Sequence, residues 1–208
     1  MISVYLLVAQ IAILCMIFCV LFAVYMGFYK KIKVETIVFE EKKVLTYNFV
    51  GPVSDFGKAM IRVCNIFKKE FNQDLDCKSF GCIHYTSDKD VESPDYMKWS
   101  VFAVIERQDL LDQIITKNSE EFQIVTIPKS RVAHACFPFK NLLSYTFGRS
   151  VVYPALENYV KTNGNLPTHG CVELYHIDDS PLEYFFFLEN EDFFSSLKEH
   201  ESENTKLW

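Results

Sequence analysis

The first 29 residues contain no charged side chain, and only Ser3 and Gln10 interrupt their apolar content. At about 1.5 Å of rise per residue, roughly 20 apolar residues cross a hydrocarbon layer about 30 Å thick. The run lacks the basic start, the short apolar stretch and the small-residue cleavage site of a secretory signal peptide. A buried helix of a soluble protein would carry a polar face, which is also missing. Residues 1–29 are therefore predicted to be a transmembrane signal anchor.

Basic residues are absent before the predicted span and begin directly after it, at Lys30, Lys31 and Lys33. Because Lys and Arg are retained on the cytosolic side of a membrane, the short N-terminus is expected to be lumenal and residues 30–208 cytosolic. The sequence also lacks an Asn-x-Ser/Thr glycosylation acceptor. Its five cysteines outside the span show no paired spacing, so we expect reduced thiols in the cytosolic part.

The sequence has too little positive charge for a nucleic-acid-binding surface. Twenty-one Lys and Arg stand against 27 Asp and Glu, and the formal net charge is −6. We therefore expect no direct contact with nucleic acid. Seven Gly and seven Pro are too few for a low-complexity chain, whereas 19 Phe and 11 Tyr indicate a packed body. The part after the anchor is long enough for one domain.

Motifs for catalysis and for cofactors are missing as well. The sequence contains no Gly-rich phosphate loop and no Ser-His-Asp spacing. Cys136 is expected on the opposite strand face from His134, which would keep the two side chains apart. Cys77 and Cys82 with His84 lack a convincing fourth zinc ligand. We therefore expect no catalytic residue, no metal and no cofactor.

The body repeats one pattern of strand, helix, strand and strand. The first copy has a strand at 44–50, a helix with Phe56, Met60, Val63 and Phe67 on one face, and strands at 81–85 and 99–105. The second copy has a strand at 131–137, a helix with Val152, Leu156 and Tyr159 on one face that stops near Asn163-Gly164, and strands at 170–177 and 182–188. The segment 108–122 is interpreted as an amphipathic connecting helix. The predicted fold class is α+β.

These elements predict four parts of the chain. They are a transmembrane signal anchor at 1–29, a juxtamembrane segment at 30–43, a domain of two repeats at 44–188 and a short acidic C-terminal tail at 189–208. Within the domain, each repeat is expected to bury one sheet face under its helix, and the other faces of the two sheets are expected to meet around a cleft.

Strand alternation nominates residues for that cleft. If Val172 and Leu174 face the helices, Glu173 and Tyr175 project to the opposite side, into the cleft. The same register in the first copy directs His84 there. A carboxylate among aromatic rings could bind a cation through charge and ring faces. The alternative for Glu173 is a surface strand residue paired with a nearby Lys or Arg.

Three segments carry a resemblance to a known family: residues 135–139 (ACFPF), residues 154–161 (PALENYVK) and residues 173–175 (ELY). They resemble membrane-anchored members of the gyrase-inhibitor-like (GyrI-like) family. The resemblance covers about residues 1–190, together with the single N-terminal span, and implies a GyrI-like domain of two strand-helix-strand-strand repeats.

The resemblance also implies a function. It predicts a single-pass endoplasmic-reticulum protein that acts as a receptor in selective autophagy of that membrane. Expected partners are ubiquitin-like autophagy modifiers, the valosin-containing protein and the lipid bilayer. The resemblance also implies a role, with the valosin-containing protein, in protein-DNA crosslink repair. Bacterial relatives imply an alternative, in which the cleft around Glu173 binds a small hydrophobic cation or hydrolyses a reactive small molecule.

The predicted tail contains a candidate for modifier binding. Phe194 and Leu197 follow Glu191 and Asp192, and an aromatic-x-x-aliphatic pattern after acidic residues is the form of peptides that add a strand to ubiquitin-like modifiers. The two apolar residues would fill two pockets while the acidic ones meet basic residues of the partner. The alternative is a last amphipathic turn in which Phe193, Phe194 and Leu197 pack on the domain.

Overall fold

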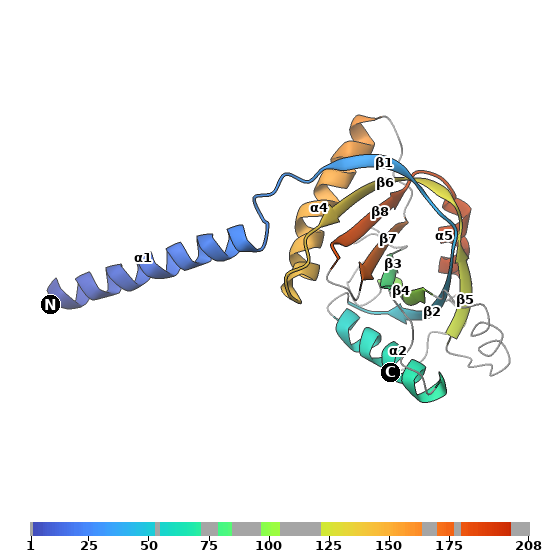
Figure 1. Cartoon of the computed structure of the whole chain (residues 1–208), viewed down its shortest axis with the longest axis horizontal. Helices are drawn as coiled ribbons and strands as arrows, with labels where there is room; N and C mark the ends of the chain where they lie inside the picture. The colour runs from blue at the N-terminus through green and yellow to red at the C-terminus, as the bar shows by residue number, and fades with distance from the viewer. Residues whose placement is uncertain are drawn as a thin grey trace.

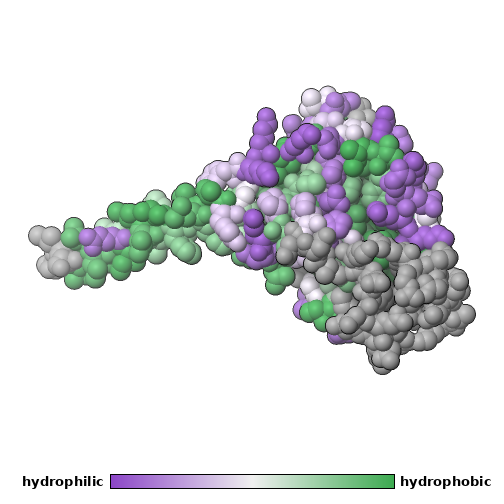
Figure 2. All heavy atoms as spheres, viewed as in Figure 1, coloured by the Kyte–Doolittle hydropathy of each residue, from purple (hydrophilic) through white to green (hydrophobic). Residues whose placement is uncertain are grey.

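The computed structural model describes residues 2–52, 55–71, 79–84, 97–104, 122–163, 170–176 and 180–200. Helix α1 (Ile2–Tyr25) projects from the rest of the chain, and its side chains form an apolar rod (Figures 1 and 2). Its Val4–Tyr25 segment is long and apolar enough to cross a membrane. Such a helix is compatible with a membrane anchor and with a signal sequence.

The structure confirms the predicted repeat. The first unit consists of β2 (Lys42–Val50), α2 (Phe56–Phe71), β3 (Ser79–His84) and β4 (Lys98–Val104). The second unit consists of β6 (Ser130–Phe137), α4 (Leu143–Thr162), β7 (Cys171–His176) and β8 (Leu182–Phe187). The predicted connecting helix at 108–122 lies, apart from its last residue, outside the described residues.

The two units share one sheet, not two sheets around a cleft as expected. β3 pairs antiparallel with β7 at the centre, and the strand order is β1-β6-β8-β7-β3-β4-β2-β5. The expectation was wrong because β3 and β7 are each the middle strand of their repeat in sequence but the edge strand of their half in space. Their free edges pair with each other and join the halves.

Two strands that the sequence analysis missed complete the sheet: β1 (Val34–Phe39) and β5 (Phe122–Ile127). β1 pairs with β6, and β2 pairs with β5, in one continuous register: Phe39 lies opposite Ser130, and Lys42 lies opposite Ile127. Where the β1–β6 pairing passes into the β2–β5 pairing, Lys129 and Glu40 form an ion pair of 3.1 Å. Because β1 leads directly into β2 and β5 into β6, the sheet curls until its two ends meet (Figure 1).

Helices cover the outer face of this curled sheet. α2 packs through Ala59 and Val63 on β2 and β4, and α4 packs through Val152, Leu156 and Val160 on β6 and β8. The helix faces predicted from apolar spacing are confirmed for the described side chains. The side chain of Phe67 lies outside them.

Helix α5 (Glu191–His200) packs against the inner face. Phe194 and Leu197 are 2% and 7% exposed and belong to the same core as Val172, Leu174 and Phe187. The segment expected to be an acidic tail thus begins with a helix of the domain, and the segment expected to be juxtamembrane contains a sheet strand. Residues 201–208 lie outside the described part.

Candidate functional site

The site is built around Glu173, whose side chain is completely buried near the middle of the sheet. It projects from β7 between two residues of the same sheet face. Tyr175, two positions along β7, donates its hydroxyl to Glu173 Oε2. His84, at the end of the neighbouring β3, places Nε2 3.1 Å from Glu173 Oε1. The three residues nominated from the sequence are therefore brought together.

Helix α4 supplies the other partners of the carboxylate. Arg149 Nε lies 2.9 and 3.0 Å from the two carboxylate oxygens, and its Nη2 donates to the Tyr175 hydroxyl oxygen at 3.2 Å. Tyr153, one helical turn further on, donates its hydroxyl to Glu173 Oε1. Because residues four apart share a helix face, Arg149 and Tyr153 approach the same carboxylate. Glu173 is held by one guanidinium and two phenols.

Aromatic rings surround the Arg149 guanidinium. Its Cζ lies 5.5 Å from the ring centre of Phe56, at the start of α2. Tyr175 contacts Phe56 and Tyr145 edge to face, with ring centres 5.4 and 4.8 Å apart. The guanidinium is thus a cation held between a carboxylate and ring faces, an arrangement that also binds cationic ligands. Its side chain is 19% exposed, so the site reaches solvent through Arg149.

The charge states of the site follow from its burial. Burial by itself raises the pKa of Glu173, but Arg149, with help from His84 and Tyr153, outweighs it and holds the pKa well below the ordinary carboxyl value. Burial and nearby negative charge raise the pKa of Tyr153 and Tyr175 well above that of a free phenol. The carboxylate is therefore ionised and the phenols protonated at neutral pH. A general base works best with a pKa near the working pH, so this site favours electrostatic binding over proton transfer.

The side of the sheet was predicted wrongly. Glu173 and Tyr175 share a strand face, as expected, but that face is covered by α4. Val172 and Leu174, which were expected to meet the helices, face the inner core with α5. The prediction failed because both faces of β7 are buried, the outer face by α4 and the inner face by α5. Apolar side chains on β7 therefore do not show which face α4 covers.

Two buried polar atoms near Glu173 have no hydrogen-bond partner within the described residues: His84 Nε2 and the Tyr184 hydroxyl. His84 Nε2 is close to the carboxylate but is not aligned for a hydrogen bond. Tyr184 is fully buried on β8, and Gly148 of α4 leaves room for its hydroxyl, since a Cβ there would lie 2.2 Å from that oxygen. An unpaired buried polar group costs about 1–3 kcal/mol, so both atoms would gain from a polar ligand.

Sequence reasoning missed Arg149, Tyr153, Phe56 and Tyr145 as site residues. A signal was present: Arg149 and Tyr153 are spaced i, i+4 on α4, beside the buried row that includes Gly148, Val152 and Leu156. The signal was not used because the cleft was expected on the other side of the sheet.

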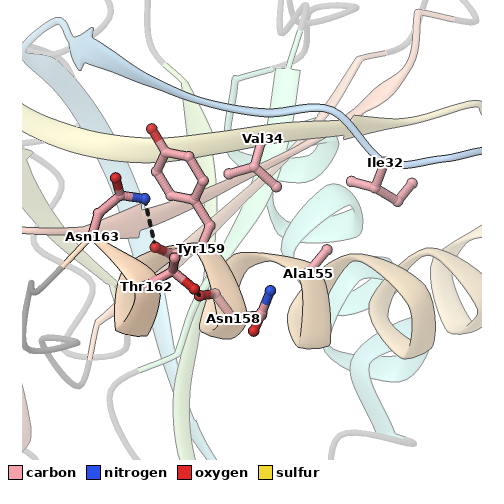
Figure 3. A pocket seen from close by; sticks show the side chains of 7 residues that line it. All are labelled: Ile32, Val34, Ala155, Asn158, Tyr159, Thr162 and Asn163. Carbon is pink, nitrogen blue, oxygen red and sulfur yellow. Dashed lines mark hydrogen bonds between the residues drawn. The ribbon is translucent and has the colours of Figure 1, made fainter.

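Two surface cavities lie away from Glu173. One, of about 290 Å³, lies between Ile32 and Val34, before and at the start of β1, and the C-terminal half of α4, where Tyr159 and Asn163 line it (Figure 3). Another, of about 310 Å³, lies between Phe49 to Pro52 and the start of α2. Glu173 lines neither of these two cavities, and its side chain is fully buried with Arg149 in place.

The predicted basic residues after α1 and acidic residues of α5 lie at the surface, whereas the apolar residues of α5 do not. Lys30, Lys31 and Lys33 are exposed between α1 and β1. Glu191 and Asp192 are exposed in the first turn of α5, while Phe194 and Leu197 are buried, as the alternative of a packed amphipathic turn expected. Binding of an autophagy modifier to these residues stays a prediction, and it requires α5 to leave the sheet.

His134 and Cys136 were expected on opposite faces of their strand, and this was wrong. Residues two apart return to the same face, and His134 Nε2 lies 3.4 Å from Cys136 Sγ. Of the three residues that the sequence analysis judged an incomplete zinc set, Cys82 is buried on the outer face and His84 is near Glu173. Cys77 lies outside the described residues.

No protein family and no curated protein matches the chain by sequence. Solved structures do match it. The crystal structure of the EcmrR C-terminal domain superposes with a TM-score of 0.53 at 18% identity, over 75% of this chain and 96% of that domain. A cryo-EM structure of an EcmrR–DNA complex gives 0.54 at 16% identity, over 86% of this chain and 67% of that one. These similarities show that the curled antiparallel sheet with its helices has the fold of the EcmrR C-terminal domain, and in this chain an apolar helix precedes that fold.

Proposed function

We propose that this protein is a membrane-anchored binding protein for a small, flat organic cation, which pairs with the Glu173 carboxylate in place of the Arg149 guanidinium. The observation that carries the proposal is the completely buried carboxylate, which already holds a cation inside an aromatic shell. The chain's own arginine closes the site when no ligand is bound.

The chemistry of the site defines the ligand class. A guanidinium or amidinium group can give two parallel hydrogen bonds to a carboxylate. Arg149 instead contacts both oxygens of Glu173 through Nε and donates Nη2 to the Tyr175 hydroxyl. Phe56 and Tyr145 offer apolar surface to an attached ring. A neutral ligand would leave Glu173 buried without a counter-ion, which is strongly unfavourable. A monocation with an aromatic body is therefore the expected ligand.

The access route supports replacement of Arg149. Of the two charged partners, Glu173 is inaccessible and Arg149 is 19% exposed, at the solvent side. An arginine has several rotatable bonds and can move into solvent without moving α4. The ligand must compete with an internal ion pair, so a modest affinity is expected.

The test is thermal unfolding of the full chain in detergent micelles with benzamidinium as the probe. A bound ligand raises the melting temperature with concentration, and at 100 times the Kd it adds about 2.7 kcal/mol of stability. We expect a concentration-dependent rise for the wild type and its loss in Glu173→Gln. Glu189→Gln is the matched control, because Glu189 is an exposed carboxylate paired with Arg131. No rise in the wild type, or an equal rise in Glu173→Gln, would contradict the proposal.

We further propose that α1 anchors the protein in the endoplasmic-reticulum membrane with residues 30–208 in the cytosol. Support comes from the uncharged helix and from the exposed Lys30, Lys31 and Lys33 directly after it.

A second candidate function is the receptor role in selective autophagy of the endoplasmic reticulum, with the valosin-containing protein as a further partner. The residues quoted above resemble testis-expressed protein 264, a membrane-anchored GyrI-like protein, and the apolar helix before the domain favours this role. Modifier binding through Phe194 and Leu197 needs α5 to be released. A peptide of residues 189–208 is therefore expected to bind an autophagy modifier more tightly than the full chain does. Absence of peptide binding at high micromolar concentration would remove this motif.

A further inference from the structure

A row of polar side chains crosses the inner face of the sheet, on the side opposite Glu173. It consists of His134 and Cys136 on β6, Glu183 on β8, His176 on β7 and Ser79 on β3. Cys136 lies directly opposite Glu183 in the β6–β8 ladder, and His176 lies opposite Ser79 in the β3–β7 ladder. Strand register therefore brings a thiol, two imidazoles and a carboxylate to one place.

We propose that His134, Cys136 and Glu183 form a binding site for Zn²⁺ or for another cation that prefers nitrogen, sulfur and oxygen ligands. The three ligand atoms, His134 Nε2, Cys136 Sγ and a Glu183 oxygen, all lie within 4.8 Å of one another. His134 Nε2 is 3.2 Å from Glu183 Oε1 and 3.4 Å from Cys136 Sγ. Ligand atoms of one tetrahedral zinc ion lie roughly 3.3–3.7 Å apart, given bonds of about 2.0–2.3 Å. Small side-chain adjustments would complete the site.

The donor set suits zinc. Imidazole nitrogen, thiolate sulfur and carboxylate oxygen are the three ligand types that zinc uses in proteins, whereas Mg²⁺ and Ca²⁺ use oxygen alone. Cys136 is exposed and the side chains of His134 and Glu183 are 12% and 28% exposed, so an ion can enter from solvent. Three protein ligands leave the fourth position to water.

Neighbouring residues hold the ligands in place. His134 stacks on the Phe185 ring, with ring centres 4.8 Å apart. Glu183 uses its second oxygen to bind His176 Nε2 at 3.0 Å, and the other nitrogen of His176 lies 2.9 Å from Ser79 Oγ. His176 is therefore placed to orient the carboxylate, as outer residues of metal sites do. A second carboxylate, Glu35, lies opposite His134 in the β1–β6 ladder and is paired with Lys33 at 2.7 Å.

This site is distinct from the Glu173 site, and neither proposal depends on the other.

The test uses the full chain in micelles, free of any histidine tag, titrated with Co²⁺ and then with Zn²⁺. A tetrahedral Co²⁺ bound to a thiolate gives a charge-transfer band in the near ultraviolet. We expect this band in the wild type, its displacement by one equivalent of Zn²⁺, and its loss in Cys136→Ser. His134→Gln should lose it too, and His176→Ala should weaken Zn²⁺ binding about 10- to 100-fold. Cys19→Ser, which removes a thiol of α1 away from the proposed site, is the control and should keep the band.

Alkylation gives an independent readout that does not need a folded variant. Zn²⁺ should protect the exposed Cys136 from iodoacetamide in the wild type, read by peptide mass spectrometry. Absence of the cobalt band in the wild type, its persistence in Cys136→Ser, or unchanged alkylation of Cys136 would overturn the site. The row would then be only a set of hydrogen-bonded polar side chains on the inner face of the sheet.

Discussion

Glu173 is the residue on which the site depends. Its side chain is fully buried, and its charge is compatible with burial only because Arg149, Tyr153, Tyr175 and His84 surround it. Removal of one partner of such a pair leaves a buried charge and typically costs about 3–5 kcal/mol. The stability of the protein should therefore respond to any change in the charge of Glu173.

The pH dependence of stability should report the Glu173 charge. Its pKa is lowered in the folded protein from an ordinary value of 4.5, so its contribution is complete above that value and is lost as pH falls below it. We expect Glu173→Gln to lower the free energy of unfolding by about 3–5 kcal/mol at pH 7, and the gap to the wild type to narrow below about pH 4.5. Urea unfolding between pH 7 and pH 3 measures this. The exposed Glu189→Gln should show no such convergence, and a constant gap for Glu173→Gln would refute the assignment.

Strand alternation alone was enough to predict three residues of the site. Glu173 and Tyr175 on β7 and His84 on β3 do converge. Arg149 was not found, because its role depends on which sheet face α4 covers. Alternation orders the two faces of a strand but does not say which one a helix covers when both are buried.

Helix α4 and strand β8 are in close contact at Gly148. A Cβ on Gly148 would lie 2.2 Å from the Tyr184 hydroxyl and 3.3 Å from Phe137. We expect Gly148→Ala to destabilise the protein by about 1–3 kcal/mol in chemical denaturation. Gly57→Ala in α2, where a Cβ meets nothing within 4 Å, should be neutral or stabilise by up to about 1 kcal/mol.

A second substitution checks the cause of that effect. Tyr184→Phe removes the hydroxyl that the new Cβ would contact, and this hydroxyl has no partner within the described residues. The double variant Gly148→Ala/Tyr184→Phe should therefore recover part of the lost stability. Equal losses in the single and double variants would place the strain elsewhere, against Phe137.

Helix α5 is expected to act as part of the core. Phe194 packs edge to face on Phe187, with ring centres 5.0 Å apart, and a Cβ on Gly170 would lie 2.4 Å from its ring. Phe194→Ala should lower the free energy of unfolding by about 3–5 kcal/mol and Leu197→Ala by about 2–5 kcal/mol. Asp192→Ala, on the exposed side of α5, should change it by less than about 0.5 kcal/mol. Wild-type stability in Phe194→Ala would favour a detachable tail.

The sequence pattern predicted the helices and strands of the repeats well and the additions to them poorly. β2, α2, β3, β4 and their counterparts followed from apolar spacing of 2 or 3.6 residues. β1 and β5 were missed, and α5 was expected only as the alternative of a packed amphipathic turn. Each is stabilised by distant partners: β1 by β6, β5 by β2, and α5 by the inner face. Local pattern does not contain such pairings.

The whole molecule joins an apolar helix directly to a curled-sheet domain. Met26, just after α1, is fully buried, and Asn141 Nδ2 lies 3.5 Å from its sulfur. Phe28 contacts Phe147 of α4 with ring centres 5.0 Å apart, and Gly27, at a φ of +84°, lies against Pro138. These contacts dock the end of α1 on the domain, so a membrane-inserted α1 would hold the domain close to the bilayer.

Topology is the prediction that belongs to this scale. If α1 spans the membrane with Lys30, Lys31 and Lys33 on the cytosolic side, protease added to intact microsomes should degrade a C-terminal tag. A glycosylation acceptor introduced into the tail should stay unmodified. A protected tag or a glycosylated tail would mean that the domain is lumenal or that α1 is a cleaved signal sequence.

The central claim, that Arg149 fills a site for an external cation, is tested most directly by chemical rescue. Arg149→Ala leaves Glu173 buried without its counter-ion, and added methylguanidinium can restore the lost charge and hydrogen bonds. Thermal unfolding should show methylguanidinium stabilising Arg149→Ala more than the wild type, and not stabilising Arg149→Ala/Glu173→Gln. Arg131→Ala, which removes an exposed arginine paired with Glu189, should respond like the wild type. Equal responses of Arg149→Ala and the double variant would contradict the claim and leave Arg149 as a structural counter-ion only.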